Sequence, residues 1–545
     1  AMAPRSLRST IALIIPMIGG YNLWLISGSH GLQIDLFDIQ LELLRVDKLA
    51  LLFGILFHLA TFLACLYAFH IRDRIQQISS LLYAGGALGA IFCGDLISLF
   101  ISWEIMALSS VFLIWARRTP RASVAGFRYL TLQIVSGLFL LAGSLLHITK
   151  TGSASFDFIG LDSLASILIF TAFGIKCAFP IVHSWLTDAY PESTPTGMVF
   201  LSSFTTKVAV YGLARSFAGT EVLIYIGTTM AMFPIFFAVI ENDLRRVLAF
   251  SLINQVGFMV VGIGIGTELA LNGAVSHAFN DVLFKGLLLM SMGAVLHQTG
   301  KINGSELGGL YKSMPITTSL CIVGAASISA FPLFSGFVSK SMVMTAAAHE
   351  GHWIIWLMLL FASAGVFHHA GIKIPFFAFF AHDSGIRTRE PPVNMLAAMI
   401  ISAALCILIG IYPGVLYNLL PWNVNYEPYT SDHIITQLQL LFFSALAFAW
   451  LKLIKLYPPE LPGINLDADW LYRTLGNHVV TKTGQIWTHT ETIISNFVLN
   501  VGFKCRRVAI QHYGSSGILT RTWSTGFSAL WIVILLGICL ILYYL

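Results

Sequence analysis

Residues 174–181 read Gly-Ile-Lys-Cys-Ala-Phe-Pro-Ile and place a lysine four residues ahead of a proline, inside an otherwise apolar run. Because Pro180 has no N–H, it cannot donate to the carbonyl of Lys176, and a helix through this run is expected to break at the proline. The run therefore predicts a discontinuous helix that carries a charge beside its break.

A similar run occurs 152 residues later, where Ala178-Phe179-Pro180-Ile181 is matched by Ala330-Phe331-Pro332-Leu333. Pro332 leaves the carbonyl of Ile328 free in the same way, and Lys340 lies nearby. Paired interrupted helices in two halves of a chain are what inverted-repeat transporters use at their sites. The pattern predicts two related halves, each with a broken helix.

The composition is that of an integral membrane protein. Of 545 residues, 57% are hydrophobic and only 10% are charged, against roughly 25% charged residues in soluble proteins. The net charge of +5 provides no basic face for nucleic acid, and the seven cysteines show neither a disulfide pattern nor a metal-ligand spacing. The sequence has no nucleotide, flavin, haem or iron–sulfur motif. We therefore expect no cofactor and no metal, and leave open whether the chain is part of an enzyme.

Fifteen apolar runs are long enough to cross the hydrocarbon core, which takes about 17 to 25 helical residues. They lie near residues 10–28, 47–70, 78–94, 96–116, 125–148, 162–180, 196–217, 221–240, 244–265, 268–297, 315–348, 352–380, 394–419, 433–456 and 526–545. We expect an all-α polytopic membrane protein with two inverted five-helix repeats that contain the broken helices. The first run has no small-residue cleavage site and is expected to be an anchor.

The expected domain organisation has six parts. They are N-terminal transmembrane helices (1–95), a first repeat (96–240), a second repeat (241–380), C-terminal transmembrane helices (381–456), an amphipathic lateral segment (457–525) and a final anchor (526–545). The lateral segment opens with Pro458-Pro459-Glu460, mixes aromatic with basic residues and is interrupted near 514–517. This composition is typical of amphipathic helices on a membrane interface or on a neighbouring subunit.

Lys and Arg are distributed unevenly between the two sides of the expected spans. Twenty-one lie on the side of the N-terminus and four on the opposite side, while six lie within spans. Since cytoplasmic loops are enriched in Lys and Arg, we expect a cytoplasmic N-terminus and an external C-terminus. The expected location is a bacterial inner membrane, with the lipid bilayer as one partner.

Seven ionisable residues lie well inside apolar spans, namely Glu104, Lys176, Lys207, Asp281, Lys285, Lys340 and Lys373. At about 2.5 to 3.5 kcal/mol each, their summed insertion cost exceeds the roughly 5 to 15 kcal/mol net stability of a typical protein. We expect these groups to be paired or hydrated rather than exposed to lipid. A lysine beside a proline break indicates water access at mid-membrane. The alternative, a kinked helix whose lysine reaches the interface, applies most to Lys373, near a span end.

One expected helix, 268–297, carries a polar stripe. His277, Asp281 and Lys285 are spaced four residues apart, which places them on one face over about two turns. Such a stripe can relay protons, since histidine titrates near neutrality and a carboxylate beside a lysine shares its protonation. A structural stripe between packed helices is the alternative. His368 and His369 are weaker candidates, because a lone membrane histidine is more commonly a packing donor.

Ordered motifs recur along about residues 30–420, in the segments 102–106, 174–186, 189–191, 193–195, 206–212, 243–251, 277–285 and 331–340. Taken together, these motifs resemble the antiporter-like subunits shared by respiratory complex I, membrane-bound hydrogenases and Mrp-type cation/proton antiporters, and most of all the Mrp D-type subunit.

The resemblance implies roles for the charges within the spans. Glu104 would pair with Lys176 of the first broken helix, and Lys207 would continue the polar axis. His277 and Lys285 would form the central relay, and Lys340 would be the lysine of the second broken helix.

Two departures from the family pattern and one further resemblance carry expectations of their own. Many relatives have a second histidine where this chain has Asp281, so the relay here carries a different charge or binds a cation. The family's usual first helix is missing, which would invert the N-terminus in agreement with the charge count. The C-terminal stretch resembles the lateral-helix extension of the distal membrane component of complex I and predicts docking onto other membrane subunits.

We therefore expect a proton- or monovalent cation/proton-translocating subunit of a multi-subunit inner-membrane complex. The alternative is a proton-channel and scaffold subunit that energises a partner enzyme, such as a redox module or an inorganic-carbon uptake subunit in the cytoplasm. A stand-alone carrier is a third possibility. The coupled ion and the direction of transport stay open.

Overall fold

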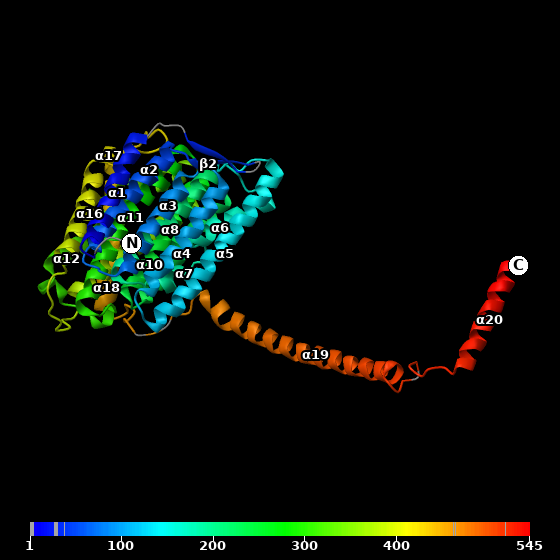
Figure 1. The fold of residues 1–545 in the computed structure, drawn as a ribbon. Coiled ribbons are helices and arrows are strands. Elements are labelled where there is room, and N and C mark those ends of the chain that lie inside the picture. The colour runs from blue at the N-terminus through cyan, green and yellow to red at the C-terminus, as the bar shows by residue number, and fades with distance from the viewer. Residues whose placement is uncertain (1–4, 27–30, 37–38, 462, 464, 518) are drawn as a thin grey trace. The chain divides into compact units, whose positions relative to one another are not determined.

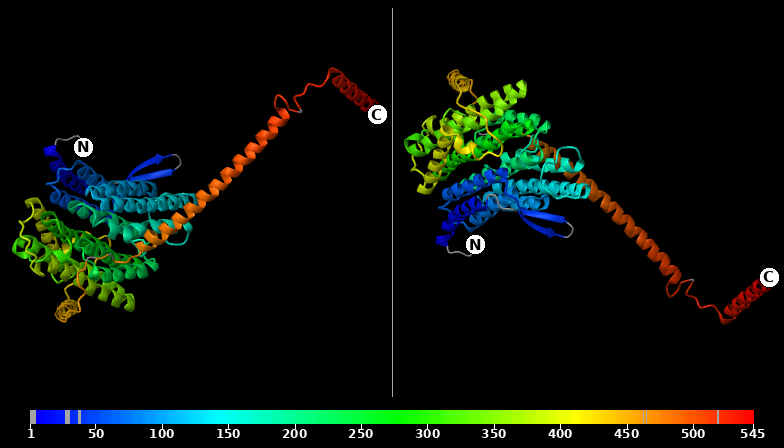
Figure 2. Two further views of the ribbon diagram at one scale, coloured as in Figure 1. Left: turned by 90° about the horizontal axis from the view of Figure 1, so that it is seen from below. Right: turned by 90° about the horizontal axis from the view of Figure 1, so that it is seen from above.

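The computed structural model describes residues 5–26, 31–36, 39–461, 463, 465–517 and 519–545. The chain divides into two compact units, Ala1–Asp467 and Ala468–Leu545. The first unit is a bundle of helices, and the second contains two long helices (Figure 1). Within the first unit, the blue-to-cyan helices and the green-to-yellow helices form two groups that lie side by side (Figure 2).

The helices of the first half of this bundle are α1 (Arg5–Ile26), α2 (Lys48–Tyr67), α3 (Arg74–Phe92), α4 (Leu96–Trp115), α5 (Pro120–Thr151), α6 (Leu164–Cys177), α7 (Ser184–Ala189), α8 (Pro195–Ser216) and α9 (Val222–Ile240). The second half contains α10 (Leu244–Ile265), α11 (Glu268–Thr299), α12 (Pro315–Ile328), α13 (Ser335–His349), α14 (Trp353–Val366), α15 (Lys373–Pro375), α16 (Val393–Ile411), α17 (Gly414–Tyr417) and α18 (Ser431–Leu453). Two π-helical segments, Phe367–Ile372 and Phe376–Phe380, flank α15, and two 3-10 turns lie at Gly304–Glu306 and Leu310–Lys312.

The expected all-α membrane fold is confirmed. Among the described residues, 13 helices are long and apolar enough to cross a membrane, and α6 and α12 are shorter apolar helices. These two are the first halves of the two interrupted spans, which explains why fifteen apolar runs give 13 full-length helices. The strands β1 (Leu32–Leu36) and β2 (Ile39–Leu44), which pair antiparallel, were not expected. Their alternation of apolar with polar residues is a strand signal inside a stretch that reads as polar.

Both predicted breaks are present and have the same backbone geometry. At the first break, Ala178 and Ile181 have left-handed φ angles of 62° and 75°. At the second break, Ala330 and Leu333, each 152 residues further along, have φ angles of 57° and 72°. A left-handed conformation costs an alanine or a branched residue roughly 1–2 kcal/mol. The same unfavourable geometry at the same spacing identifies the two breaks as one motif used twice.

The helices around the breaks repeat as well. Asp95 caps the N-terminus of α4 and Asp243 caps that of α10. The next helices, α5 and α11, have 32 residues each, and both end at a left-handed glycine, Gly152 or Gly300. Five spans separate the start of α4 from that of α10, and because five is odd, the equivalent helices run in opposite directions. The structure therefore contains an inverted repeat.

The C-terminal unit contains a π-helical turn (Leu471–Gly476), the 37-residue α19 (Asn477–Tyr513) and α20 (Thr525–Tyr544). The interruption expected near 514–517 is confirmed, since α19 ends at Tyr513 and Gly514 follows as its C-cap. The predicted series of amphipathic helices is mainly one long helix. None of the described residues of α19 or α20 is buried within the unit.

The second break depends on a glycine. A Cβ at Gly336, at the start of α13, would lie 1.9 Å from the carbonyl oxygen of Ser327 near the end of α12. We predict that Gly336→Ala lowers the free energy of unfolding by more than about 2 kcal/mol, because the two half-helices must separate. Gly286→Ala is the matched control, since a Cβ there meets nothing within 4 Å and alanine favours the helix. Thermal unfolding in detergent measures both, and equal midpoints for the two variants would contradict the prediction.

Candidate functional site

Helix α11 lies at the centre of the bundle and carries the predicted polar stripe. It contacts α8, α10, α12, α13 and α16. His277, Asp281 and Lys285 are each at most 1% exposed. Because the helix is surrounded on all sides, each of these groups finds its partner on a neighbouring helix rather than in water or lipid.

Asp281 forms an ion pair with Lys207 of α8. The Nζ of Lys207 lies 2.6 Å from Oδ2 of Asp281, and both side chains are fully buried. Lys207 also donates to the backbone carbonyl of Ser202 at 3.2 Å. The second carboxylate oxygen of Asp281, Oδ1, has no hydrogen-bond partner among the described residues. The pair thus joins the first repeat to the second and leaves one strong acceptor free inside the protein.

The other two members of the stripe bond to α10 and α13. The Nζ of Lys285 donates to Oγ of Ser251 at 2.7 Å. The ring of His277 lies between Gln255, with Nε2 3.0 Å from Oε1, and Ser339, with Nδ1 3.1 Å from Oγ. A histidine with a polar partner on each ring nitrogen can accept a proton on one side and release one on the other.

At the second break, Lys340 occupies the acceptor that the proline leaves free. Its Nζ donates to the carbonyl oxygen of Ile328 at 3.0 Å and lies 5.1 Å from the ring centroid of Phe258. The lysine is 1% exposed. The carbonyl of Ile328, which Pro332 is predicted to leave without a donor, therefore accepts a hydrogen bond from the ammonium group of Lys340.

At the first break, Lys176 is also fully buried, but its partner is different. The Nζ donates to the carbonyl oxygen of Trp103 at 2.7 Å and lies 4.2 Å from the centroid of the Trp103 ring. Glu104, next along α4, forms no ion pair with Lys176 among the described residues, and its Oε1 has no hydrogen-bond partner there. The carboxylate lies against α5, where a Cβ at Gly137 would come within 1.6 Å of Oε1. The structure thus offers Lys176 of α6 two possible acceptors on consecutive residues of α4, and the lysine bonds to the carbonyl of Trp103 rather than to the carboxylate of Glu104.

We call the seven residues of this series the polar file: Glu104, Lys176, Lys207, His277, Asp281, Lys285 and Lys340. The ion pair of Lys207 and Asp281 connects the first repeat to the second, and His277 and Lys285 bond to helices within the second repeat. No hydrogen bond among the described residues joins Lys176 to Lys207, although α6 packs against α8. The groups are thus brought into one buried region, and their role in transport stays a prediction.

The three weaker candidates lie in and beside the π-helical segments. The ring of His368 stacks on Tyr457 at 5.5 Å, which is a packing contact. His369 is fully buried, with no hydrogen-bond partner on either ring nitrogen among the described residues. Lys373, also fully buried, donates to the carbonyls of Val239 and Glu241, each at 2.6 Å, and so caps the end of α9. π-helical turns frequently occur at functional sites.

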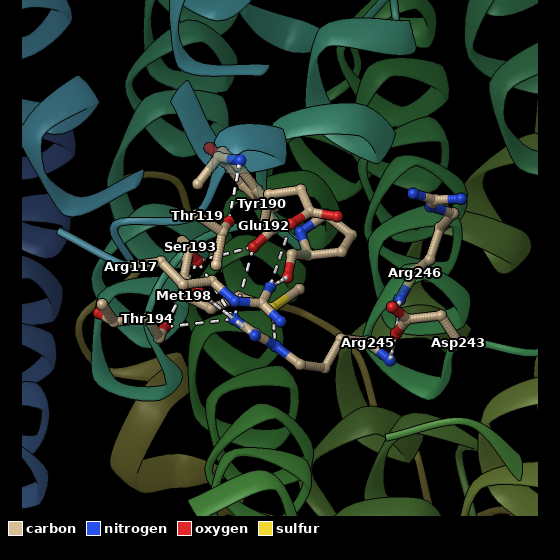
Figure 3. A network of polar contacts seen from close by, with 12 residues as sticks. Arg117, Thr119, Tyr190, Glu192, Ser193, Thr194, Met198, Asp243, Arg245 and Arg246 are labelled. Atoms are coloured by element: carbon tan, nitrogen blue, oxygen red, sulfur yellow. Dashed lines mark hydrogen bonds and ion pairs between the residues drawn. The ribbon is translucent and has the colours of Figure 1, made fainter. Parts of the chain in front are cut away.

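A buried arginine fixes the turn between the first broken helix and α8. Arg245 of α10 is 1% exposed and donates to the carbonyls of Ser193, at 3.1 Å, and Thr194, at 3.2 Å (Figure 3). Arg117, which follows the C-terminal end of α4, contacts the same turn (Figure 3) and donates to the carbonyl of Pro191 at 2.6 Å. Because guanidinium groups satisfy several carbonyls at once, this network sets the position of α8, and with it Lys207, relative to α10.

Sequence reasoning missed the neutral partners of the charged groups. Ser251 and Gln255 are four residues apart on α10, and Ser339 directly precedes Lys340. Polar residues spaced four apart in an apolar span are a usable signal. The carbonyl of Trp103 has no signal in the sequence, because every residue has a carbonyl.

We predict strong coupling between Lys207 and Asp281. Removing one partner of a buried ion pair costs about 3–5 kcal/mol, because the other charge is left unpaired, whereas replacing both with apolar groups is often close to neutral. Lys207→Met and Asp281→Leu should each lower the free energy of unfolding, and the double variant should be more stable than either. Denaturant unfolding of the three variants measures this coupling, and additive losses would show that the pair carries none.

Comparison with known proteins identifies the family. The profile described as NADH:quinone oxidoreductase/Mrp antiporter, transmembrane, matches residues 93–368, just over half of the chain. A curated relative, the A-type component of the Na(+)/H(+) antiporter of Alkalihalophilus pseudofirmus, is 28% identical over 424 residues, which cover 68% of this chain and 52% of the relative. The chain thus spans about half the length of that relative. The relative is of the A type, whereas the sequence motifs led us to expect the D type, and motifs common to both types cannot separate them.

Solved structures share the fold. The structure of the Mrp complex from Dietzia sp. DQ12-45-1b contains a chain with a TM-score of 0.69 and 20% identity, covering 76% of this chain and 91% of its own. A chain of the membrane-bound sulfane sulfur reductase, an archaeal respiratory membrane complex, has a TM-score of 0.71 and 21% identity, and covers 98% of this chain and 96% of its own. The family profile, the inverted repeat and the broken helices agree, and the chain belongs to the NADH:quinone oxidoreductase/Mrp antiporter transmembrane family.

Proposed function

We propose that this chain is a proton- or monovalent cation/proton-translocating subunit of a multi-subunit inner-membrane complex. The observation that carries the proposal is the polar file, in which four lysines, one histidine and one aspartate are almost completely buried among membrane-spanning helices. Burying so many ionisable groups is expensive, and such groups in membrane spans mark ion pathways. Membership of the family and the curated Na(+)/H(+) antiporter relative support the same function.

The contacts support a transfer route through the file. The route begins at Lys176, which bonds to a backbone carbonyl and has no carboxylate in contact. Lys207 and Asp281 form the link between the repeats, and Lys285, with Ser251, continues it. His277 and Lys340 complete the route at the second break. The pair of Lys207 and Asp281 is the one direct bond within the file among the described residues. Water would therefore have to join Lys176 to Lys207, and Asp281 to Lys285, His277 and Lys340.

Glu104 serves as the control element in this proposal. An ammonium beside a carboxylate keeps its proton, whereas an ammonium separated from the carboxylate in a dry site releases it more readily. The structure holds Lys176 on the Trp103 carbonyl, with the Glu104 carboxylate free at Oε1. Movement of the lysine between these two neighbouring acceptors would couple its protonation to the remainder of the file.

The finer assignment concerns the subunit type and the coupled ion. The curated relative supports an Mrp A-type ancestry over the D type, and sodium as the coupled cation. Asp281, with one oxygen unpartnered, is the candidate cation ligand. We also propose the boundaries 96–240 and 241–380 for the repeats, other membrane subunits as partners, and a cytoplasmic N-terminus.

A second candidate function is a proton channel and scaffold that energises a partner enzyme. It is supported by the sulfane sulfur reductase chain, whose fold matches 98% of this chain, so that the match extends into the C-terminal unit. In that case, a partner enzyme would copurify with the complex, and flux would depend on its turnover.

The first test removes the groups at the first break. We predict that Lys176→Ala and Glu104→Ala each lower sodium- or potassium-driven proton movement in inverted vesicles that carry the complex by about ten-fold or more. Gly137→Ala should act in the same direction without removing a charge, because its Cβ displaces the Glu104 carboxylate. Gly85→Ala on α3, whose Cβ meets nothing within 4 Å, is the control. Undiminished flux in the Lys176 variant would refute the assignment.

The second test concerns orientation. Cys505 of α19 is exposed within its unit, and Arg389, in the exposed segment before α16, lies on the same predicted side. A membrane-impermeant maleimide should label Cys505, and an Arg389→Cys variant, in inverted vesicles only, because both positions belong to the side rich in Lys and Arg. Labelling of either position in right-side-out vesicles would reverse the proposed orientation.

A further inference from the structure

The segment that leads from α18 to the C-terminal unit lies against the bundle. We call residues 457–467 the strap; positions 462 and 464 lie outside the described residues. The strap contains no helix or strand among its described residues. Segments without secondary structure usually run over the surface, where water hydrates their polar groups. In the strap, however, the carboxylates of Glu460 and Asp467 are largely buried.

The first carboxylate contacts the lysine between the π-helical segments. Oε1 of Glu460 lies 3.0 Å from Nζ of Lys373, and their side chains are 5% and 0% exposed. The three donors of the ammonium are used by carbonyls of Ala238, Val239 and Glu241 at the end of α9. Glu460 therefore places a negative charge in direct contact with an ammonium group that otherwise contacts backbone carbonyls.

The second carboxylate contacts the first broken helix. Oδ1 and Oδ2 of Asp467 lie 3.1 Å and 3.2 Å from Nε2 of His183, whose side chain is 4% exposed. His183 follows the proline break by three residues and directly precedes α7. Its ring packs at 4.6 Å from that of Phe233 on α9. The carboxylate thus fixes the ring at the point where the chain leaves the first break.

Two further contacts hold the strap, one ahead of Glu460 and one between the two carboxylates. Tyr457 stacks on His368 of the first π-helical segment, and Nδ2 of Asn465 donates to Oε2 of Glu241 at 3.1 Å. The strap thus contacts the first repeat at one end and the second at the other. It also gives a common role to three features that the polar file leaves unused, namely His368, Lys373 and the Pro458-Pro459-Glu460 sequence.

We propose that the strap is a positioning element of the translocation site, in which Glu460 and Asp467 hold Lys373 and His183 so that the ends of both repeats keep one arrangement. The inference rests on the proposed function for its transport readout. Burying a carboxylate costs several kcal/mol unless it is paired, so each pair must form for the strap to stay docked. Glu460 and Asp467 are positioning residues, which act through the lysine and the histidine.

The geometry can be tested without transport. A hydrophobic carbodiimide joins a carboxylate to an amine in contact with it, forming an amide as the carbodiimide takes up the elements of water and becomes a urea. In the wild-type complex it should crosslink Glu460 to Lys373, detected by mass spectrometry as one joined peptide pair. The crosslink should disappear in Glu460→Gln and in Lys373→Met. Its absence from the folded wild-type complex would overturn the inference.

The function of the strap is tested by flux in inverted vesicles. Glu460→Gln and Asp467→Asn should each lower ion-driven proton movement several-fold, and the conservative variants Glu460→Asp and Asp467→Glu should restore most of it. Asp469→Asn is the control, because Asp469 pairs with Arg473 inside the C-terminal unit. In a Lys373→Met background, Glu460→Gln should have no further effect.

The outcomes separate this inference from the proposed function. Wild-type flux in both Glu460→Gln and Asp467→Asn, with Lys176→Ala inactive, would overturn the positioning role and leave the translocation proposal standing. Flux unaffected by Lys176→Ala would overturn the translocation proposal, and the crosslink would still report whether the strap is docked. Equal losses in the conservative and the neutral variants would overturn the role assigned to the carboxylates.

Discussion

The charges buried inside the bundle constrain everything else in this structure. An ionised group in a low-dielectric interior must find an opposite charge, a dipole or water, since its desolvation otherwise costs several kcal/mol. The pair of Lys207 and Asp281, 2.6 Å apart and fully buried, meets this requirement with an opposite charge. Because its partners lie on different repeats, the requirement also holds α8 against α11. The same ion pair therefore neutralises the buried charges and holds the two halves of the bundle together.

The broken helices solve the same problem with backbone dipoles. A proline in a helix leaves a carbonyl without a donor, which is unfavourable in a membrane unless another donor reaches it. At the second break Lys340 is that donor, so the orphan carbonyl and the orphan ammonium satisfy each other. At the first break Lys176 uses a carbonyl of α4 instead, next to a glutamate that has an unpartnered oxygen. The inverted repeat thus provides two related sites whose lysines have different environments.

The sequence predicts the parts of this arrangement that depend on local chemistry. The length of the apolar runs predicts the membrane spans, and the two prolines predict the helix breaks. The four-residue spacing of His277, Asp281 and Lys285 predicts that they share one helix face. The Lys207 pairing could not be predicted from spacing, because the partners are 74 residues apart and helix rotation decides which side chains meet. The pairing of Glu460 with Lys373 could not be predicted either, because Glu460 lies in a polar stretch of sequence that is expected to be solvated. The left-handed backbone at Ala178 and Ala330 could not be predicted either, because neither position has the glycine that usually indicates this conformation.

Transfer along the proposed polar file requires a continuous hydrated path between the two breaks. A density map of the assembled complex at a resolution that shows ordered water tests it most directly. The account predicts water molecules that connect Lys176 with Lys207 and continue past Lys285 and His277 to Lys340. Apolar side chains that fill the space between these groups, with no water between them, would contradict it.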